Sequence, residues 1–279
     1  MTAATSPRAA QSAAALLPDA GRTVLELQSA TMRFGGIVAV NSFDLTIPRG
    51  LITGLIGPNG AGKTTVFNMI TGFYKPTSGQ IIFNNRNLTG LAPHVVCKAG
   101  IARTFQNIRL FHGLSSLQNV MVGGHLRQKS QWWMPPLQLP LVRREEKFLR
   151  EAGMALLKRL DLADVAHLPA GSLPYGAQRR LEIARALATS PSLLLLDEPA
   201  AGMNPQESSD LMNLIRAIRD DFDLTILLIE HDMKVVMGVC AHIWVLEYGM
   251  CTAEGDPEAI RGNPRVIEAY LGEEYTKHA

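Results

Sequence analysis

The sequence predicts an α/β fold with a central parallel sheet, and three stretches indicate it. The apolar run 51–56 leads into a glycine-rich turn, Gly57–Thr65, which a helical pattern follows. Two further runs, Leu193–Leu196 and Thr225–Ile229, are apolar throughout and have the length of strands. Such continuous runs suit strands that are buried on both faces. Because helical patterns separate the runs, we expect crossover connections and parallel strands.

The glycine-rich turn, Gly57–Thr65 (GPNGAGKTT), fits the phosphate-loop pattern G-x-x-x-x-G-K-[ST] between a strand and a helix, as the pattern requires. Its glycines let the main chain approach a phosphate, and the N–H groups at a helix start favour anions. Lys63 is expected to bridge β- and γ-phosphates, and the Thr64 hydroxyl to bind Mg²⁺. The alternative, an ordinary glycine-rich loop, leaves the Lys-Thr pair unexplained. The expected nucleotide ligands are Gly57, Pro58, Asn59, Gly60, Ala61, Gly62, Lys63, Thr64 and Thr65.

Polar side chains follow both of the later apolar runs. Asp197 and Glu198 come after the first run, and His231 comes after the second. In an open α/β sheet, ligands bind beyond the carboxyl ends of the strands. One acid can bind Mg²⁺ through water, and the other can position and deprotonate the attacking water. The competing interpretations are two solvated acids at a turn and a structural histidine.

A small antiparallel sheet is expected beside the nucleotide site. The runs 23–27, 37–47 and 79–83 carry β-branched residues with partial alternation, which is typical of strands. A turn over 32–36 carries Phe34, whose ring is expected to stack on adenine. On local sequence alone, a core or turn aromatic residue is an equally good interpretation of Phe34.

From about residue 107 the pattern becomes helical. Ser115 is expected to cap a helix over 115–122, and an amphipathic helix is expected over 143–160. Between them, the prolines of 128–142 exclude a regular helix, and Trp132–Trp133 either pack in an irregular loop or form a docking patch. The other expected elements are a strand that ends within 101–107, helices over 178–188, 205–222 and part of 260–271, and a final strand over 243–246.

Composition and charge exclude several classes of protein. The formal net charge of +2 is far from that of a dedicated nucleic-acid binder, so no nucleic-acid partner is expected. The three cysteines lack metal-ligand spacing, which indicates reduced thiols. No apolar run reaches the 18 residues of a membrane span, so we expect a soluble chain whose membrane role requires a partner. Residues 1–22, rich in Ala, Ser and Pro, are expected to be a disordered tail.

Taken in order, these motifs resemble those of the ATP-binding cassette (ABC) ATPases. Besides the phosphate loop, the segment 173–188 stands just before the leucine run, and Gln106 and His231 occur in sequence. The resemblance covers nearly the whole chain from about residue 23. It implies a RecA-like core, an antiparallel β subdomain and an α-helical subdomain of about 107–178, together forming one domain over 23–279. It also implies ATP and Mg²⁺ as cofactors.

The resemblance assigns a role to each matching residue. Phe34 matches the aromatic residue that stacks on adenine, and Gln106 matches the glutamine that senses Mg²⁺ and the transport partner. Asp197 matches the Mg²⁺-coordinating aspartate, Glu198 the catalytic base and His231 the switch histidine. The implied catalytic residues are Lys63, Gln106, Glu198 and His231, and the implied Mg²⁺ ligands are Thr64, Gln106 and Asp197.

The signature segment departs from the family's common LSGGQ. Leu173 and Gly176 are kept, whereas Pro174 replaces the serine, Tyr175 the first glycine and Ala177 the glutamine. Proline offers neither a hydroxyl nor an N–H group. Gly176 is therefore expected to bind the nucleotide of a facing cassette in a weakened sandwich.

A finer resemblance is to the ATPases of branched-chain amino-acid importers, carried by 175–185, 197–205, 228–233 and 266–272. It implies permease chains, a second ABC ATPase, an indirect periplasmic binding protein and a place at the cytoplasmic face of the inner membrane. Urea-type importer and lipopolysaccharide-export ATPases remain alternatives, as does a soluble ABC ATPase of iron–sulfur cluster assembly. The residues leave open the substrate and the choice between homodimer and heterodimer.

Overall fold

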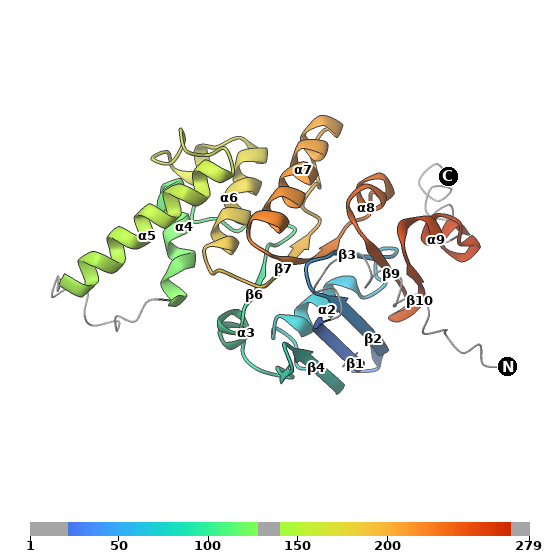
Figure 1. Ribbon diagram of the computed structural model, residues 1–279. Coiled ribbons are helices and arrows are strands. Elements are labelled where there is room, and N and C mark those ends of the chain that lie inside the picture. Colours follow the sequence, from blue (N-terminus) through green and yellow to red (C-terminus); the bar gives the residue numbers. More distant parts are fainter. Residues whose placement is uncertain (1–21, 128–139, 269–279) are drawn as a thin grey trace.

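The computed structural model describes residues 22–127 and 140–268, and a six-stranded sheet lies at its centre (Figure 1). The strand order is β10-β9-β3-β8-β7-β6, and all neighbours run parallel except β10 and β9. The bounds are β3 (Ile52–Ile56), β6 (Ile101–Arg103), β7 (Leu193–Asp197), β8 (Thr225–Ile229), β9 (His242–Glu247) and β10 (Met250–Gly255). Every residue of β3, β7 and β8 is buried, which confirms the predicted parallel core.

Helices lie on both faces of this sheet, and a further group of helices lies at one end of the molecule (Figure 1). The helices are α2 (Lys63–Ile70), α3 (Pro93–Ala99), α4 (Ser116–Gly124), α5 (Pro140–Arg159), α6 (Tyr175–Leu187), α7 (Pro205–Asp221), α8 (Met233–Val239) and α9 (Pro257–Arg261). The helices predicted over 178–188 and 205–222 are confirmed, and 264–268 is helical within the expected run 260–271. In the part of the chain that the structure describes, no helix is long and apolar enough to cross a bilayer.

The side chains of the central strands alternate between two cores. Leu194 and Leu196 of β7 belong to a core shared with α6, α7 and α8. Leu193 and Leu195 belong to the other core, which includes Phe67 of α2 and residues of the second sheet. This division follows from the two-residue period of a strand, and it explains why all these positions are leucine.

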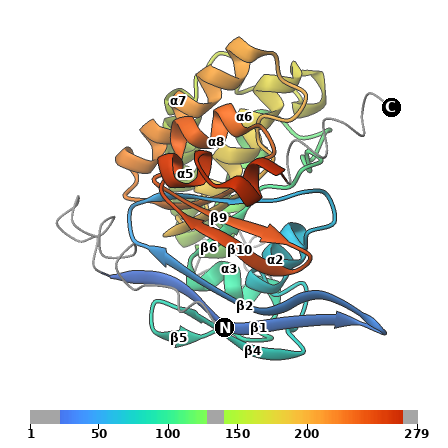
Figure 2. The same cartoon turned by 90° about the vertical axis from the view of Figure 1, so that its right-hand side faces the viewer.

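The second sheet is antiparallel, with the order β2-β1-β4-β5 (Figure 2). It consists of β1 (Thr23–Phe34), β2 (Ile37–Pro48), β4 (Ser78–Phe83) and β5 (Arg86–Asn87), and its existence confirms the prediction from the β-branched runs. The predicted turn over 32–36 is too long. Phe34 pairs directly with Ile37, so β1 extends to Phe34 and only two residues turn the hairpin, with Gly35 at a φ of 58°.

The helical part is formed by α4, α5 and α6, which pack on one another at one end of the molecule (Figure 1). Ser115 caps α4 in a capping box with Gln118, as predicted. The exclusion of helix over 128–142 is wrong at its end, because α5 begins at Pro140, where the first turn needs no proline N–H. The Trp132–Trp133 pair and residues 1–21 lie outside the described residues.

The strand predicted over 243–246 is not the last one. It is β9, and β10 follows it as the antiparallel edge of the sheet. β10 (MCTAEG) has neither a continuous apolar run nor a β-branched alternation, so the sequence pattern does not reveal this strand.

Candidate nucleotide site

The predicted site residues converge at one edge of the central sheet because the strands that carry them are parallel. β3 pairs with β8 from Ile52 opposite Ile226, and β7 pairs with β8 from Leu193 opposite Thr225. The strands therefore end together. The phosphate loop follows β3, Asp197 ends β7 with Glu198 next to it, and His231 is the second residue after β8.

The phosphate loop requires its glycines for steric reasons. Gly57 has a φ of 148°, and a Cβ there would lie 1.9 Å from the Leu246 carbonyl oxygen. Gly62, with a φ of 106°, precedes α2, and a Cβ there would lie 2.5 Å from the Ala39 carbonyl oxygen. Lys63 Nζ donates to the Gly57 carbonyl at 2.6 Å and to the Pro58 carbonyl at 2.9 Å. The loop thus curls around a lysine at a helix N-terminus, an arrangement that favours phosphate.

Glu198 is the point where three of the predicted residues meet. Gln106 Nε2 donates to Glu198 Oε2 at 2.8 Å, and His231 Nδ1 lies 3.8 Å from the same oxygen. Glu198 has a φ of 46°, and its N–H donates to the Ile229 carbonyl at 2.9 Å. This unusual backbone conformation turns the side chain off the end of β7, and the Glu198 side chain is 16% exposed against 61% for His231.

Asp197 lies in a more enclosed place. Its side chain is only 5% exposed, and Arg103 Nη2 donates to its Oδ2 at 2.7 Å. The pair joins the end of β6 to the end of β7, two strands that lie side by side. Sequence analysis did not identify Arg103, because a single arginine near a strand end carries no pattern.

Comparisons with protein families and with known proteins identify the family of this chain. The model described as "ABC transporter" matches residues 40–201. The chain is 47% identical over 252 residues to the high-affinity branched-chain amino acid transport ATP-binding protein BraF of Pseudomonas aeruginosa, covering 90% of this chain and 99% of that protein. The chain belongs to the ABC transporter ATP-binding family. It binds and hydrolyses ATP as an ABC ATPase, and the predicted ABC ATPase fold is confirmed.

Other known proteins match this chain over a similar length. The high-affinity branched-chain amino acid transport ATP-binding protein LivG of Escherichia coli strain K12 is 47% identical over 250 residues, which are 90% of this chain and 98% of that protein. The ADP conformation of MJ1267, an ATP-binding cassette of an ABC transporter, superposes with a TM-score of 0.79 at 30% identity, covering 90% of this chain and 99% of that one. A model described as "Branched-chain amino acid ATP-binding cassette transporter" matches residues 253–276.

In this ABC ATPase, the loop that carries Gln106 is held by a buried ion pair on α6. Arg179 Nη1 lies 2.9 Å from Glu182 Oε2, and both side chains are at most 1% exposed. Arg179 donates to the carbonyls of Phe105 at 2.6 Å and Gln106 at 2.8 Å, and Glu182 accepts from the Phe105 N–H. Burial raises the pKa of Glu182, while the Arg179 charge acts in the opposite direction.

The signature segment is hydrogen-bonded to the loop after β7. The Tyr175 hydroxyl donates to the Ala201 carbonyl at 3.0 Å and accepts from Arg179 at 3.2 Å. Tyr175 therefore has a hydrogen-bonding role that the glycine of the common signature cannot have. Gly176 lies beside it in the first turn of α6, within the helical part, whereas the other predicted nucleotide ligands lie in the hairpin and the phosphate loop.

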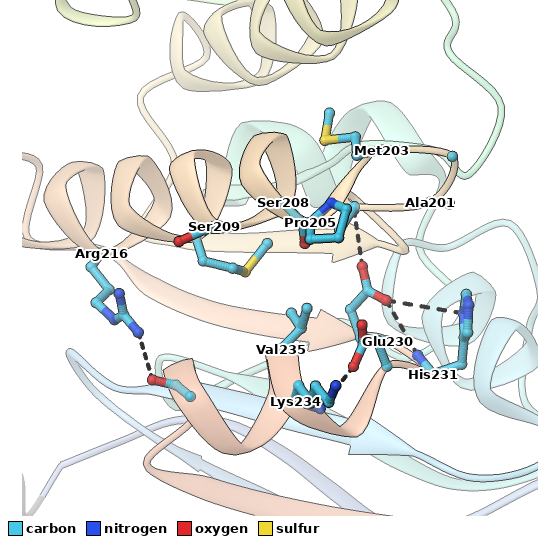
Figure 3. A pocket seen from close by; sticks show the side chains of 15 residues that line it. Ala201, Met203, Pro205, Ser208, Ser209, Arg216, Glu230, His231, Lys234 and Val235 are labelled. Carbon is cyan, nitrogen blue, oxygen red and sulfur yellow. Dashed lines mark hydrogen bonds and ion pairs between the residues drawn. The ribbon is translucent and has the colours of Figure 1, made fainter.

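A pocket of about 470 Å³ lies beside His231, between the loop after β7 and helices α7 and α8 (Figure 3). The buried Glu230 carboxylate borders it and accepts from the Ala200 N–H at 2.9 Å and the His231 N–H at 3.3 Å. Burial raises the pKa of Glu230. One carboxylate thus holds the backbone after both β7 and β8, including the backbone of His231.

Phe34 lies at the end of β1 and is 43% exposed. Its ring meets the edge of Tyr74 with 5.2 Å between centroids. Sequence analysis did not identify Tyr74, which follows α2 and has no motif of its own. An exposed ring held by an aromatic neighbour is suited to stacking on a base.

The buried Arg179–Glu182 pair generates a stability prediction. Arg179→Met leaves the Glu182 carboxylate buried without its counter-charge, so unfolding by denaturant should show a loss of about 3–5 kcal/mol. The double variant Arg179→Met/Glu182→Gln removes the same hydrogen bonds to Phe105 and Gln106 but no longer buries an uncompensated charge, so it should lose less. A double variant as unstable as the single one would contradict this account of the pair.

Proposed function

We propose that this ABC ATPase is the motor subunit of an importer for branched-chain amino acids, with its hydrolysis site at the carboxyl edge of the central sheet. The observation that supports the hydrolysis site best is the convergence of Gln106 and His231 on one carboxylate oxygen of Glu198. The substrate class rests on the names of the relatives, which are transport proteins for these amino acids over nearly the same length.

In the proposed site, residues 57–65 hold the phosphates of ATP and Phe34 stacks on the adenine. Thr64, Gln106 and Asp197 are the proposed Mg²⁺ ligands. Their donors are a hydroxyl, an amide oxygen and a carboxylate, which are the oxygen ligands that Mg²⁺ prefers. The amide nitrogen of Gln106 donates to Glu198. The amide oxygen of Gln106 is therefore the atom that would bind Mg²⁺. Mg²⁺, when bound, supplies charge neutralisation of the phosphates.

Glu198 is the proposed general base. Its carboxylate takes a proton from water while the water oxygen bonds to the γ-phosphorus and the bond to ADP breaks. A base placed in this way contributes about 10²–10⁴-fold to the rate. Gln106 holds the reacting oxygen of Glu198 by its hydrogen bond, and His231, close to the same oxygen, is placed to contact the γ-phosphate.

A facing cassette completes the site in this proposal. The phosphate loop of one chain meets the Gly176 segment of the other, and Pro174 cannot supply the usual serine contact. ATP drives closure only through its higher affinity for the closed pair. The partners proposed here are two permease chains, a second ABC ATPase and, indirectly, a periplasmic binding protein, with this chain at the cytoplasmic face of the inner membrane. The proposed domain spans residues 23–279, with the helical subdomain of about 107–178 inserted in it.

The catalytic assignment predicts a strong effect of Glu198→Gln. This change keeps the shape of the side chain but removes the base, so steady-state ATP turnover should fall at least about a hundredfold while ATP binding persists. Glu151→Gln, a change on the exposed surface of α5, is the matched control and should hydrolyse ATP normally. If Glu198→Gln keeps normal turnover, another residue is the base.

The partner assignment predicts what accompanies the chain in mildly solubilised membranes. Mass spectrometry of the purified material should identify two multi-span permeases and a second ABC ATPase. Cells in which Glu198→Gln replaces the wild-type chain should lose uptake of labelled leucine and keep uptake of labelled urea. Loss of urea uptake alone would favour a urea-type importer, and lipopolysaccharide-export or iron–sulfur assembly proteins in the purified material would favour those alternatives.

A further inference from the structure

The environment of Asp197 contains a cation that no motif accounts for. Arg103, the last residue of β6, is 6% exposed in its side chain and pairs with the 5% exposed Asp197 side chain at 2.7 Å. We propose that Arg103 is a positioning residue for the metal site: its charge compensates Asp197 and limits how tightly that carboxylate holds Mg²⁺. This inference rests on the proposed role of Asp197 as a Mg²⁺ ligand.

Contacts from several elements hold the guanidinium of Arg103 in place. Its Nη1 donates to Asn68 Oδ1 on α2 at 2.6 Å, while Nη2 donates to Asp197 on β7. Its central carbon lies 5.4 Å from the ring centre of Phe67 and 5.0 Å from that of Phe105. The planar guanidinium can donate in two directions while it lies near two rings, which the point charge of a lysine cannot reproduce.

These contacts join every part of the site that handles the metal. Asn68 and Phe67 belong to the helix that follows the phosphate loop, and Phe105 is the residue before Gln106. Asp197 stands next to Glu198. A displacement of Arg103 would therefore change contacts in α2, in the loop that carries Gln106 and at the end of β7.

The charge balance explains why a cation is needed at this place. A carboxylate as buried as that of Asp197 is costly without a counter-charge. If Mg²⁺ enters with ATP and leaves with ADP, the metal cannot be a permanent counter-ion of Asp197. Arg103 is permanent, and while Mg²⁺ is bound its charge repels the metal. The pair therefore lowers the free-energy cost of burying the Asp197 charge when no metal is bound, and it weakens the binding of the metal.

The test uses Mn²⁺ as a probe in the Glu198→Gln background with a non-hydrolysable ATP analogue, so no turnover interferes. Arg103→Met removes the charge and approximately keeps the volume, whereas Arg103→Lys keeps the charge and loses the planar double contact. Two readouts are measured for each variant. They are Mn²⁺ affinity by electron paramagnetic resonance, and the melting temperature of the analogue complex with Mn²⁺ and with a chelator.

Arg103→Met should melt on the order of 10 °C lower than the parent protein in chelator, because Asp197 then lacks a counter-charge. Mn²⁺ should restore part of this loss, and its affinity should rise several-fold because the repelling charge is gone. Arg103→Lys should keep a Mn²⁺ affinity close to that of the parent protein. If Arg103→Met binds Mn²⁺ no more tightly, or melts lower by the same amount with and without the metal, Arg103 only packs and the proposal is wrong.

Asp197→Asn separates this inference from the proposed metal site. In that variant Mn²⁺ affinity should fall, and adding Arg103→Met should no longer increase the metal-dependent gain in melting temperature. If Asp197→Asn leaves Mn²⁺ affinity unchanged, the proposed metal role of Asp197 fails, and this inference fails with it. If Asp197→Asn behaves as expected but Arg103→Met does not, only the role of Arg103 is refuted.

Discussion

The in-register parallel pairing of β3, β8 and β7 is the constraint on which the site depends. Parallel strands that pair residue by residue end at the same edge, and every chain segment that leaves them starts from that edge. The phosphate loop, the two acids and His231 are far apart in sequence but follow strands that end at the same edge for this reason. Every residue of these strands is buried, and the leucines of β7 divide between the two cores, Leu194 and Leu196 on one side and Leu193 and Leu195 on the other.

Buried charges then orient the loops that leave this edge. The loop over 104–109 has an ion pair on each side: Arg103–Asp197 against the sheet and Arg179–Glu182 against α6. Both pairs are desolvated, so neither is strong evidence for stability in itself, but removal of one partner is costly. Such pairs restrict the loop to few conformations, and that restriction places Gln106 against Glu198. Tyr175 and Glu230 restrict the loop after β7 in a similar way, through hydrogen bonds to its backbone.

Much of this arrangement could be predicted from the sequence, because its central elements have strong local patterns. The phosphate loop, the apolar runs over 193–196 and 225–229 that form β7 and β8, and the Ser115 cap each follow from residue type and spacing. The supporting residues do not. A buried arginine such as Arg103 or Arg179 looks like any surface arginine until its partners from distant segments are known. The edge strand β10, which has no strand-like pattern, and the start of α5 at Pro140 depend on tertiary context in the same way.

The most direct test of the account is a high-resolution structure of Glu198→Gln bound to Mg²⁺ and ATP. The account predicts the β- and γ-phosphates within the loop 57–65, Mg²⁺ beside Thr64, Gln106 and Asp197, and the γ-phosphate between residue 198 and His231. It also predicts Gly176 of a facing cassette over the same nucleotide. Phosphates bound away from this loop, or a metal without contact to Asp197 directly or through water, would contradict it.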